Sequence, residues 1–400
     1  MGQQKTRKIK GLKGCLKRMA FFCVKKNQKQ MADYLVKEVE NKRWIWFKKA
    51  NTYLQLEEEA FLVFDKIQKS TILPIEWCAK KFNISVEEAS ESVNAINEIT
   101  TEELTREPQE RNKLAEGIRA ETVFFSRYTY SFQASNFEFC YGDAKIETMF
   151  HPLFAHLQNT EKIENPIVLK IFVSQNAYHL FVNENGIGSW AFNEDHILKG
   201  QVFMTLLNYA YAKKENDWLG VLHASAIGDD KNSVLFLGDS GNGKSTASAI
   251  ALASGLSLIA DDFVPIDTNA KVLTFPAAIS VKKQALEFLS IRFPELLKAK
   301  EYELKAMNKT VRYLAPSFIK NSPRKIKALV FIQFTKDVDF ELRKMDRHKA
   351  FQYLVVDAWL SPEEKNARFF LDWIAKIPIY SLRYSDNQKM VFAVKSLISQ

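Results

Sequence analysis

The stretch from Val234 to Thr246 reads Val-Leu-Phe-Leu-Gly-Asp-Ser-Gly-Asn-Gly-Lys-Ser-Thr. Its first four residues are apolar and predict a buried strand, and the good helix formers after Lys244 predict a helix. The loop between them completes the pattern G-x-x-x-x-G-K-[S/T], which is typical of phosphate-binding loops. Glycines let backbone N–H groups turn toward an anion, and the positive end of the following helix adds to the attraction. The stretch therefore predicts a strand–loop–helix unit that binds a nucleoside triphosphate.

The residue types in this loop indicate separate roles. Lys244 is long enough to reach the terminal phosphates, and the Ser245 hydroxyl is a ligand for Mg²⁺. We expect ATP with Mg²⁺ as the cofactor, and GTP stays open because the sequence contains no motif that recognises a base. The predicted nucleotide-binding residues are Gly238, Asp239, Ser240, Gly241, Asn242, Gly243, Lys244, Ser245 and Thr246.

A pair of aspartates, Asp261-Asp262, ends the first strand expected after the loop helix, at residues 256–260. If that strand lies beside the loop strand, its carboxyl end meets the bound phosphates at the same edge of the sheet. One carboxylate can then hold Mg²⁺, and the other can accept the proton of an attacking hydroxyl. Paired aspartates at a strand end also form turns and caps, but this position favours the catalytic interpretation.

The loop, the segment Leu258-Ile-Ala-Asp-Asp262 and His223 on the preceding strand together resemble the catalytic domain of HPr kinase/phosphorylase. That family is related in fold to phosphoenolpyruvate carboxykinase. The resemblance implies an α/β domain over 120–400 (α+β for the whole chain), with a mixed sheet and flanking helices. It further implies an ATP-dependent serine kinase of the cytoplasm that forms homo-oligomers.

Carried over residue by residue, the resemblance makes Asp261 the general base and gives Mg²⁺ to Asp262 together with Ser245. Lys244 would stabilise the transferred phosphoryl group, and His223 would lie near it. His223 can alternatively be a buried structural histidine.

The chain departs from this family downstream of Asp262. The segments that recognise the family's carrier-protein substrate, and that support its phosphate-releasing reverse activity, are not found. Lys305, Lys309 and Arg312 lie in a polar stretch there. They could reach the substrate or the phosphates, or they could form a solvated basic face. The resemblance therefore does not extend to the family's carrier-protein substrate or to its reverse activity, and both stay open for this chain.

Residues 31–115 predict a small separate α+β domain. Two strands are expected at 43–47 and 52–56, then a helix with the apolar stripe 60, 61, 64 and 67, and a short helix after Pro74. Ser85-Val-Glu-Glu88 is a capping box that starts a third helix. The pattern resembles the PqqD-like winged-helix module, which binds leader peptides. It implies a peptide or protein phosphoacceptor, with a precursor peptide bound by 31–115 in a peptide-modification system. A nucleic-acid-binding winged helix is the alternative, but its third helix would place four glutamates against phosphates.

The net charge of +9 comes from residues 1–30, which contain ten Lys and Arg and no acid. The remaining chain has 46 basic residues, the total of 56 less these ten, against 47 acidic ones, so no nucleic-acid partner is expected. The leader 1–30 is expected to be either disordered or a basic amphipathic helix, with weak membrane-surface contact through residues 5–29. Four scattered cysteines and the lack of a long apolar run predict a soluble cytoplasmic protein.

Two functions compete on this sequence. One is a kinase that transfers the γ-phosphoryl group of ATP to a hydroxyl, and the other is a phosphate-loop ATPase or GTPase switch, or a scaffold, without a phosphoacceptor. The early aspartate pair favours the kinase. Further elements are predicted as strands at 128–132, 137–139, 167–173, 178–182, 221–227, 328–334 and 379–384, and as helices at 196–211, 283–290, 347–359, 366–375 and 387–398.

Overall fold

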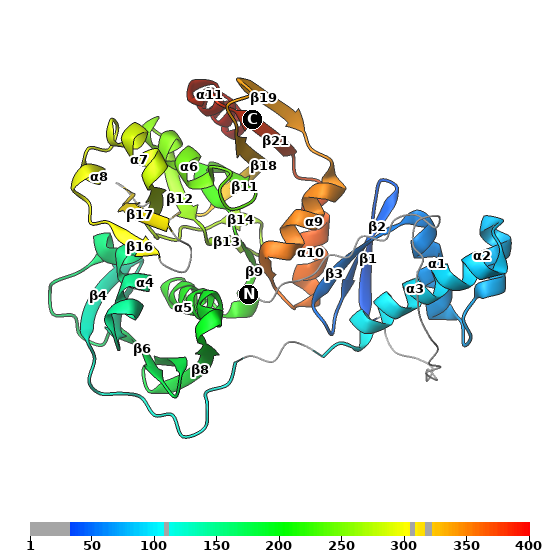
Figure 1. Ribbon diagram of the computed structural model, residues 1–400, viewed down its shortest axis with the longest axis horizontal. Helices are drawn as coiled ribbons and strands as arrows, with labels where there is room; N and C mark the ends of the chain where they lie inside the picture. Colours follow the sequence, from blue (N-terminus) through cyan, green and yellow to red (C-terminus); the bar gives the residue numbers. More distant parts are fainter. Residues whose placement is uncertain (1–32, 108–111, 305–308, 317–321) are drawn as a thin grey trace. The chain divides into compact units, whose positions relative to one another are not determined.

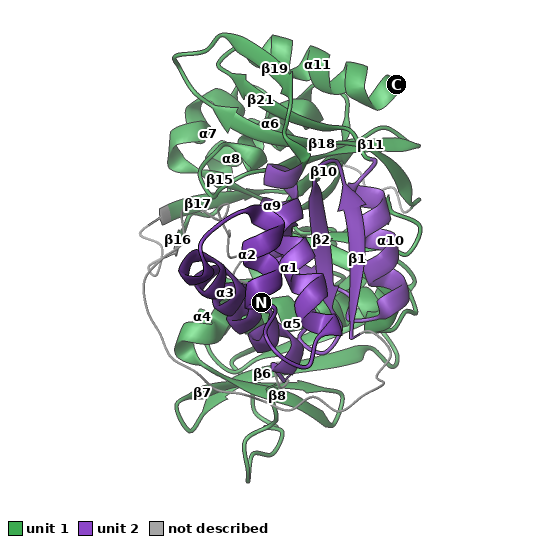
Figure 2. Ribbon diagram, turned by 90° about the vertical axis from the view of Figure 1, so that its right-hand side faces the viewer, with its two compact units in different colours: residues 1, 110–347, 377–400 green, residues 2–109, 348–376 purple. Residues whose placement is uncertain are grey.

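The computed structural model describes residues 33–107, 112–304, 309–316 and 322–400. The predicted leader 1–30 and Lys305 lie outside the described residues. Two compact units divide the chain (Figure 2). The first contains the described residues from 112 to 347 and from 377 to 400, and the second those from 33 to 107 and from 348 to 376. This division assigns 348–376 to the unit of the amino-terminal segment, whereas the sequence pattern included them in 120–400.

The amino-terminal part of the second unit is a three-stranded antiparallel sheet followed by three helices (Figure 1). The two predicted strands and three predicted helices are confirmed, and both hydrogen bonds of the capping box at Ser85 and Glu88 form. One strand, β1, was not expected, because its Lys and Glu residues interrupt the apolar pattern. The elements are β1 (Tyr34–Val39), β2 (Lys42–Phe47), β3 (Thr52–Glu57), α1 (Glu58–Lys69), α2 (Ile75–Phe82) and α3 (Val86–Thr105).

Both faces of strand β2 are covered, which explains why four consecutive apolar residues, 44–47, are all buried. Ile45 and Phe47 join the core made with α1, α2 and α3. On the other face Trp44 stacks on Phe351, with ring centroids 4.1 Å apart, and its Nε1 donates to Nδ1 of His348 at 3.2 Å. These contacts tie α9 (Arg347–Asp357), β20 (Ala358–Leu360) and α10 (Glu364–Ile374) to this unit.

The first unit begins with a mixed five-stranded sheet in the order β4-β5-β6-β7-β8. Only β5 and β6 run parallel, because α4 connects them. The predicted helix 196–211 is confirmed as α5. Strand β8 and helix α4 were not predicted. The elements are β4 (Ser126–Phe132), β5 (Ser135–Tyr141), α4 (Ala144–Phe154), β6 (Ile167–Ser174), β7 (Ala177–Val182), β8 (Asn185–Ala191) and α5 (Asp195–Ala210).

The main sheet of the first unit has the order β12-β10-β11-β18-β14-β13-β9, and β21, which also pairs with β19, lies beside the carboxyl half of β18. Strands β11, β18 and β21 are parallel. Because β10 is antiparallel to both β11 and β12, β12 runs in the same direction as well. The strands are β9 (Trp218–Leu222), β10 (Ser225–Gly228), β11 (Asn232–Leu237), β12 (Ser257–Asp261), β13 (Val264–Asp267), β14 (Lys271–Val272), β18 (Arg324–Phe334), β19 (Phe340–Lys344) and β21 (Ile379–Tyr384).

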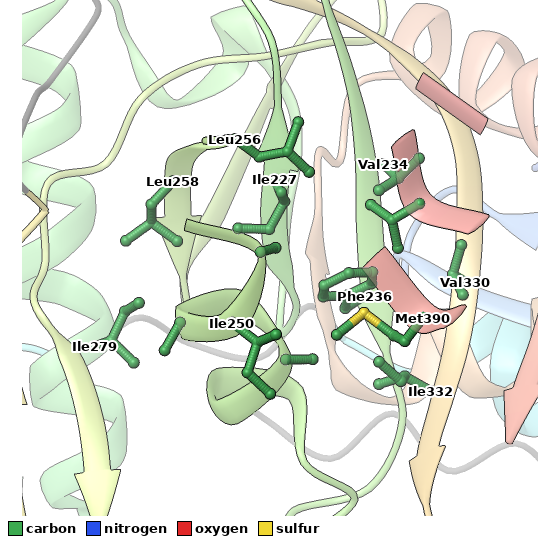
Figure 3. Close-up of a cluster of buried hydrophobic side chains, with 14 of the residues drawn as sticks. Ile227, Val234, Phe236, Ile250, Leu256, Leu258, Ile279, Val330, Ile332 and Met390 are labelled. Atoms are coloured by element: carbon green, nitrogen blue, oxygen red, sulfur yellow. The ribbon is translucent and has the colours of Figure 1, made fainter. Parts of the chain in front are cut away.

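Helices α6 (Lys244–Ala253) and α11 (Asn387–Ser399) share one apolar core with this sheet. Figure 3 shows Ile250 of α6 and Met390 of α11 in the same cluster as Phe236 of β11 and Ile332 of β18. A smaller sheet, β15-β17-β16, and two helices complete the unit. They are β15 (Ile279–Lys282), α7 (Lys283–Ser290), α8 (Glu295–Lys298), β16 (Tyr302–Leu304) and β17 (Lys309–Leu314). The predicted mixed α/β class is confirmed at this level.

Candidate functional site

The loop between β11 and α6 has the predicted strand–loop–helix setting, and α6 begins at Lys244. Gly238, Gly241 and Gly243 have φ angles of 131°, 102° and 94°, which favour glycine. Two of them also allow close approach to β18. A Cβ on Gly238 would lie 3.0 Å from the carbonyl oxygen of Ile332, and one on Gly243 would lie 3.3 Å from Cβ of Phe334. The loop conformation therefore depends on glycine at these positions.

Lys244 is buried and folds back over its own loop. Its Nζ donates to the carbonyl oxygens of Gly238 at 2.7 Å and Asp239 at 3.4 Å. Carbonyl oxygens are weaker partners for an ammonium group than charged phosphate oxygens are. The Nζ group of Lys244 can therefore donate to phosphate oxygens in place of the loop carbonyls.

Asp261 ends β12 and is buried, with 5% of its surface exposed. Its Oδ2 accepts a hydrogen bond from Oγ of Ser245 at 3.0 Å, and its Oδ1 accepts one from Ser225 of β10. Burial raises the pKa of Asp261 to about 6, although the two serine hydrogen bonds oppose this rise. A buried carboxylate thus lies beside the loop serine that was predicted to bind Mg²⁺.

Asp262 differs from Asp261 in its exposure, its hydrogen-bond partner and the direction of its pKa shift. Its side chain is 56% exposed, and its Oδ1 lies 2.9 Å from Nδ1 of His223. Desolvation acts to raise its pKa, but the hydrogen bond with His223 and the charges of Lys199 and Lys244 outweigh it and hold the pKa well below the usual range. Its φ angle of 67° is left-handed, a conformation that aspartate adopts more readily than most residues. Asp262 is therefore an ionised, accessible carboxylate.

Two strand breaks explain why His223 meets Asp262. The chain passes from β9 to β10 at residues 223–224, and from β12 to β13 at residues 262–263. Leu222 pairs with Val264, and Ser225 pairs with Asp261, so the two breaks lie opposite each other. The prediction of one continuous strand over 221–227 is therefore wrong. The break occurs because β9 pairs with β13, whereas β10 pairs with β11 and β12.

The grouping of these side chains differs from the one implied by the resemblance. Ser245 was grouped with Asp262 as a metal site, but its hydroxyl is bonded to Asp261. His223 has 35% of its side chain exposed and lies beside the Asp262 carboxylate. The remaining loop residues, from Asp239 to Asn242, are exposed or partly exposed, and Thr246 lies in the first turn of α6.

Arg312 performs neither of the roles expected for it. It donates two hydrogen bonds of 2.7 Å from Nη1 to the carbonyl oxygens of Leu296 and Leu297, and it forms an ion pair with Glu301 at 3.6 Å. It thereby stabilises the carboxyl end of α8. Lys305 lies outside the described residues, as does the side chain of Lys309.

Sequence reasoning missed Ser225 and Lys199. Ser225 lies two residues after His223. If its strand had been expected to pair antiparallel with the aspartate strand, Ser225 would have been placed beside Asp261. Lys199 lies on α5, and its Nζ is 4.0 Å from Oδ2 of Asp262. Nothing in its local sequence distinguishes it from other surface lysines, because its role depends on packing between distant segments.

Within the ranges that the structure describes, His, Cys, Asp and Glu side chains form no cluster of three that could hold a metal ion. Beside the loop, Oγ of Ser245 and Oδ2 of Asp261 lie 3.0 Å apart. None of the described helices has both the length and the apolar character needed to span a membrane.

Comparisons with known proteins give little beyond this geometry. No family model matches the chain, and no curated protein matches its sequence. Among solved structures, the Hpr(Ser) kinase/phosphatase from Coxiella burnetii is similar with 10% sequence identity and a TM-score of 0.20. The match covers 45% of this chain and 88% of that chain. A likeness of this size assigns no residue role to this chain.

Proposed function

We propose that this protein is a kinase that transfers the γ-phosphoryl group of ATP to a hydroxyl. The observation that carries the proposal is the arrangement at one edge of the sheet. A phosphate loop there adjoins a buried carboxylate, Asp261, and an exposed carboxylate, Asp262, which have different partners and pKa values shifted in opposite directions. Two carboxylates in different environments are suited to two different tasks.

The buried carboxylate suits a cation. Mg²⁺ prefers oxygen ligands and is commonly held by one or two protein oxygens together with substrate phosphates. Asp261 Oδ2 and Ser245 Oγ, 3.0 Å apart beside the loop, are such a pair, so the residues fit Mg²⁺. When bound, the ion neutralises charge on the phosphate oxygens. We therefore assign the metal role to Asp261 and Ser245, in place of the pairing of Ser245 with Asp262 implied by the resemblance.

The exposed carboxylate is the one that an acceptor hydroxyl can reach. Asp262 is ionised at neutral pH and accessible, and its hydrogen bond with His223 orients it. The acceptor hydroxyl would give its proton to the Asp262 carboxylate while its oxygen forms a bond to the γ-phosphorus. The bond between that phosphorus and the bridging oxygen breaks, and ADP leaves with the electron pair. Lys244 would stabilise the charge on the phosphoryl group, and His223 acts as a positioning residue for Asp262.

The acceptor is proposed to be a serine of a peptide or protein. This part rests on the sequence resemblance of 31–115 to peptide-binding modules. A precursor peptide of a modification system is the first acceptor to test.

The decisive experiment follows labelled phosphate from γ-labelled ATP with Mg²⁺ and a library of serine-containing peptides. We expect the wild-type protein to label an acceptor, Asp262→Asn to lose the transfer while still binding ATP, and Lys244→Ala to lose ATP binding. Asp261→Asn should bind ATP but lose the Mg²⁺-dependent transfer. Release of inorganic phosphate that persists in Asp262→Asn, with no acceptor labelled in any protein, would instead establish the ATPase alternative.

A further inference from the structure

The order of the strands indicates how a bound nucleotide would be oriented along the edge of the sheet, which the phosphate loop alone does not. On one side of the loop strand β11 lie β10 and then β12, which ends at Asp261, directly before Asp262. On the other side lie β18 and then β21, which run parallel to β11 and end at the same edge. A terminal phosphate must lie near Lys244 and the aspartates. The nucleoside end of the same molecule is therefore expected over the ends of β18 and β21.

An exposed aromatic side chain occupies that position. Phe334 is the last residue of β18, and 46% of its surface is exposed. Its backbone N–H donates to the carbonyl oxygen of Asn242 in the phosphate loop at 3.1 Å. The Cβ of Phe334 also lies close to Gly243 in the same loop. The backbone and Cβ of Phe334 thus lie directly against the loop that would hold the phosphates.

The position of Phe334 on β18 and its contact with Tyr384 fix its orientation. Val330, Ile332 and Phe334 alternate along β18 and so point to the same face of the sheet. The first two are buried in the core with α6 and α11, whereas Phe334 extends past the end of that core. Its ring packs edge-on with that of buried Tyr384, at the end of β21, with a centroid distance of 5.6 Å and an interplanar angle of 81°. An aromatic ring fixed in this way and still open to solvent is suited to stacking on a planar ligand.

We propose that Phe334 is the stacking platform for the purine base of the bound nucleotide. The inference rests on the proposed function, because it requires a triphosphate in the loop. Stacking recognises the flat face of a base and not its hydrogen-bonding edge. The platform therefore accepts adenine and guanine alike, and it contributes to affinity without choosing between ATP and GTP.

The test compares three ligands that share the phosphates but differ in the base: ATP, GTP and inorganic tripolyphosphate, each with Mg²⁺. Dissociation constants are measured by calorimetry for the wild type, Phe334→Ala, Phe334→Tyr and Phe392→Ala. Phe392 lies on α11, is 75% exposed, and serves as the matched control for removal of an exposed phenylalanine. Circular dichroism establishes that each variant is folded.

We expect Phe334→Ala to weaken binding of either nucleotide roughly ten- to hundredfold, the loss typical of a stacked base. Tripolyphosphate should bind Phe334→Ala as it binds the wild type, and Phe334→Tyr and Phe392→Ala should bind nucleotides normally. An unchanged nucleotide affinity in Phe334→Ala would overturn the inference, and so would an equal loss for tripolyphosphate, which would mean that Phe334 acts only by shaping the loop. If the wild type binds none of the three ligands, the proposed function itself fails.

Discussion

Replacing Asp261 by Asn is expected to make the first unit more stable at neutral pH while removing its Mg²⁺-dependent activity. Burial raises the pKa of this carboxyl from 3.8 to about 6 in the folded protein. Each tenfold change in a protonation constant corresponds to about 1.4 kcal/mol, so keeping Asp261 ionised costs the folded state about 3 kcal/mol. Asparagine has nearly the same shape, resembles the protonated acid, and can still bond the hydroxyls of Ser225 and Ser245.

The sign of the effect follows from the direction of the shift. Because the folded pKa lies above the unfolded one, the wild type loses stability as the pH rises from about 4 to about 6, and the loss is complete above that. The variant lacks this titration. The difference between the two proteins should be near zero at pH 4 and should reach about 3 kcal/mol at pH 7. Asp262, whose folded pKa is depressed, contributes in the opposite sense, but it is present in both proteins and cancels in the difference.

The assay is urea unfolding at several pH values, each sample then pulse-labelled by hydrogen exchange under one fixed condition. The amides of β10 and β12 report on the first unit by itself, which whole-chain fluorescence would not do. Saturating Mg²⁺ and ATP should narrow the difference at pH 7, because a ligand at 100 times its dissociation constant stabilises the protein that binds it by about 2.7 kcal/mol and the variant lacks the carboxylate proposed to hold Mg²⁺. A variant that is less stable than the wild type at pH 7, or a difference that does not change with pH, would refute the reasoning.

Three further substitutions test other parts of the structure. His223→Ala removes the hydrogen bond that orients Asp262, so kcat for phosphoryl transfer should fall by at least about tenfold while ATP affinity stays near the wild-type value, and an unchanged kcat would count against His223 as a positioning residue. Gly243→Ala places a Cβ at a φ of 94°, and we expect a loss of about 1–2 kcal/mol in unfolding experiments and weaker ATP binding; ATP affinity equal to the wild type would count against the loop geometry. Trp44→Ala removes a fully buried ring stacked on Phe351 and should destabilise the second unit by about 3–5 kcal/mol in urea, measured by exchange of β2 amides, while those of β12 stay unchanged.

The sequence predicted those parts of the site that are contiguous in the chain. The phosphate loop and the aspartate pair are local patterns, and each includes the strand or helix that positions it. The partners of those residues could not be predicted in the same way. Ser225 reaches Asp261 only because β10 lies between β11 and β12, and no local pattern distinguishes that order from others.

The same limit applies to the division of the chain. Helices at 347–359 and 366–375 were predicted, and α9 and α10 confirm them except that 358–359 lie in β20; periodicity does not indicate which sheet a helix covers. The uninterrupted burial of β2 was the one available signal, since a strand that is apolar on both faces requires a layer on each side. Three helices close in sequence account for one layer only.

The second unit is assembled from two segments that the ribosome makes at different times. Trp44 is synthesised about 300 residues before Phe351, an interval of about 15 to 60 s at ordinary rates of translation. During that interval the amino-terminal sheet has only one of its two native layers, and the Trp44 face is without its native cover. The first unit, in contrast, has all but its last strand and helix by residue 347. The Trp44 face of a nascent chain is therefore expected to need protection until residues 348–376 have been made. A chain that stops before residue 348 would lack part of the second unit.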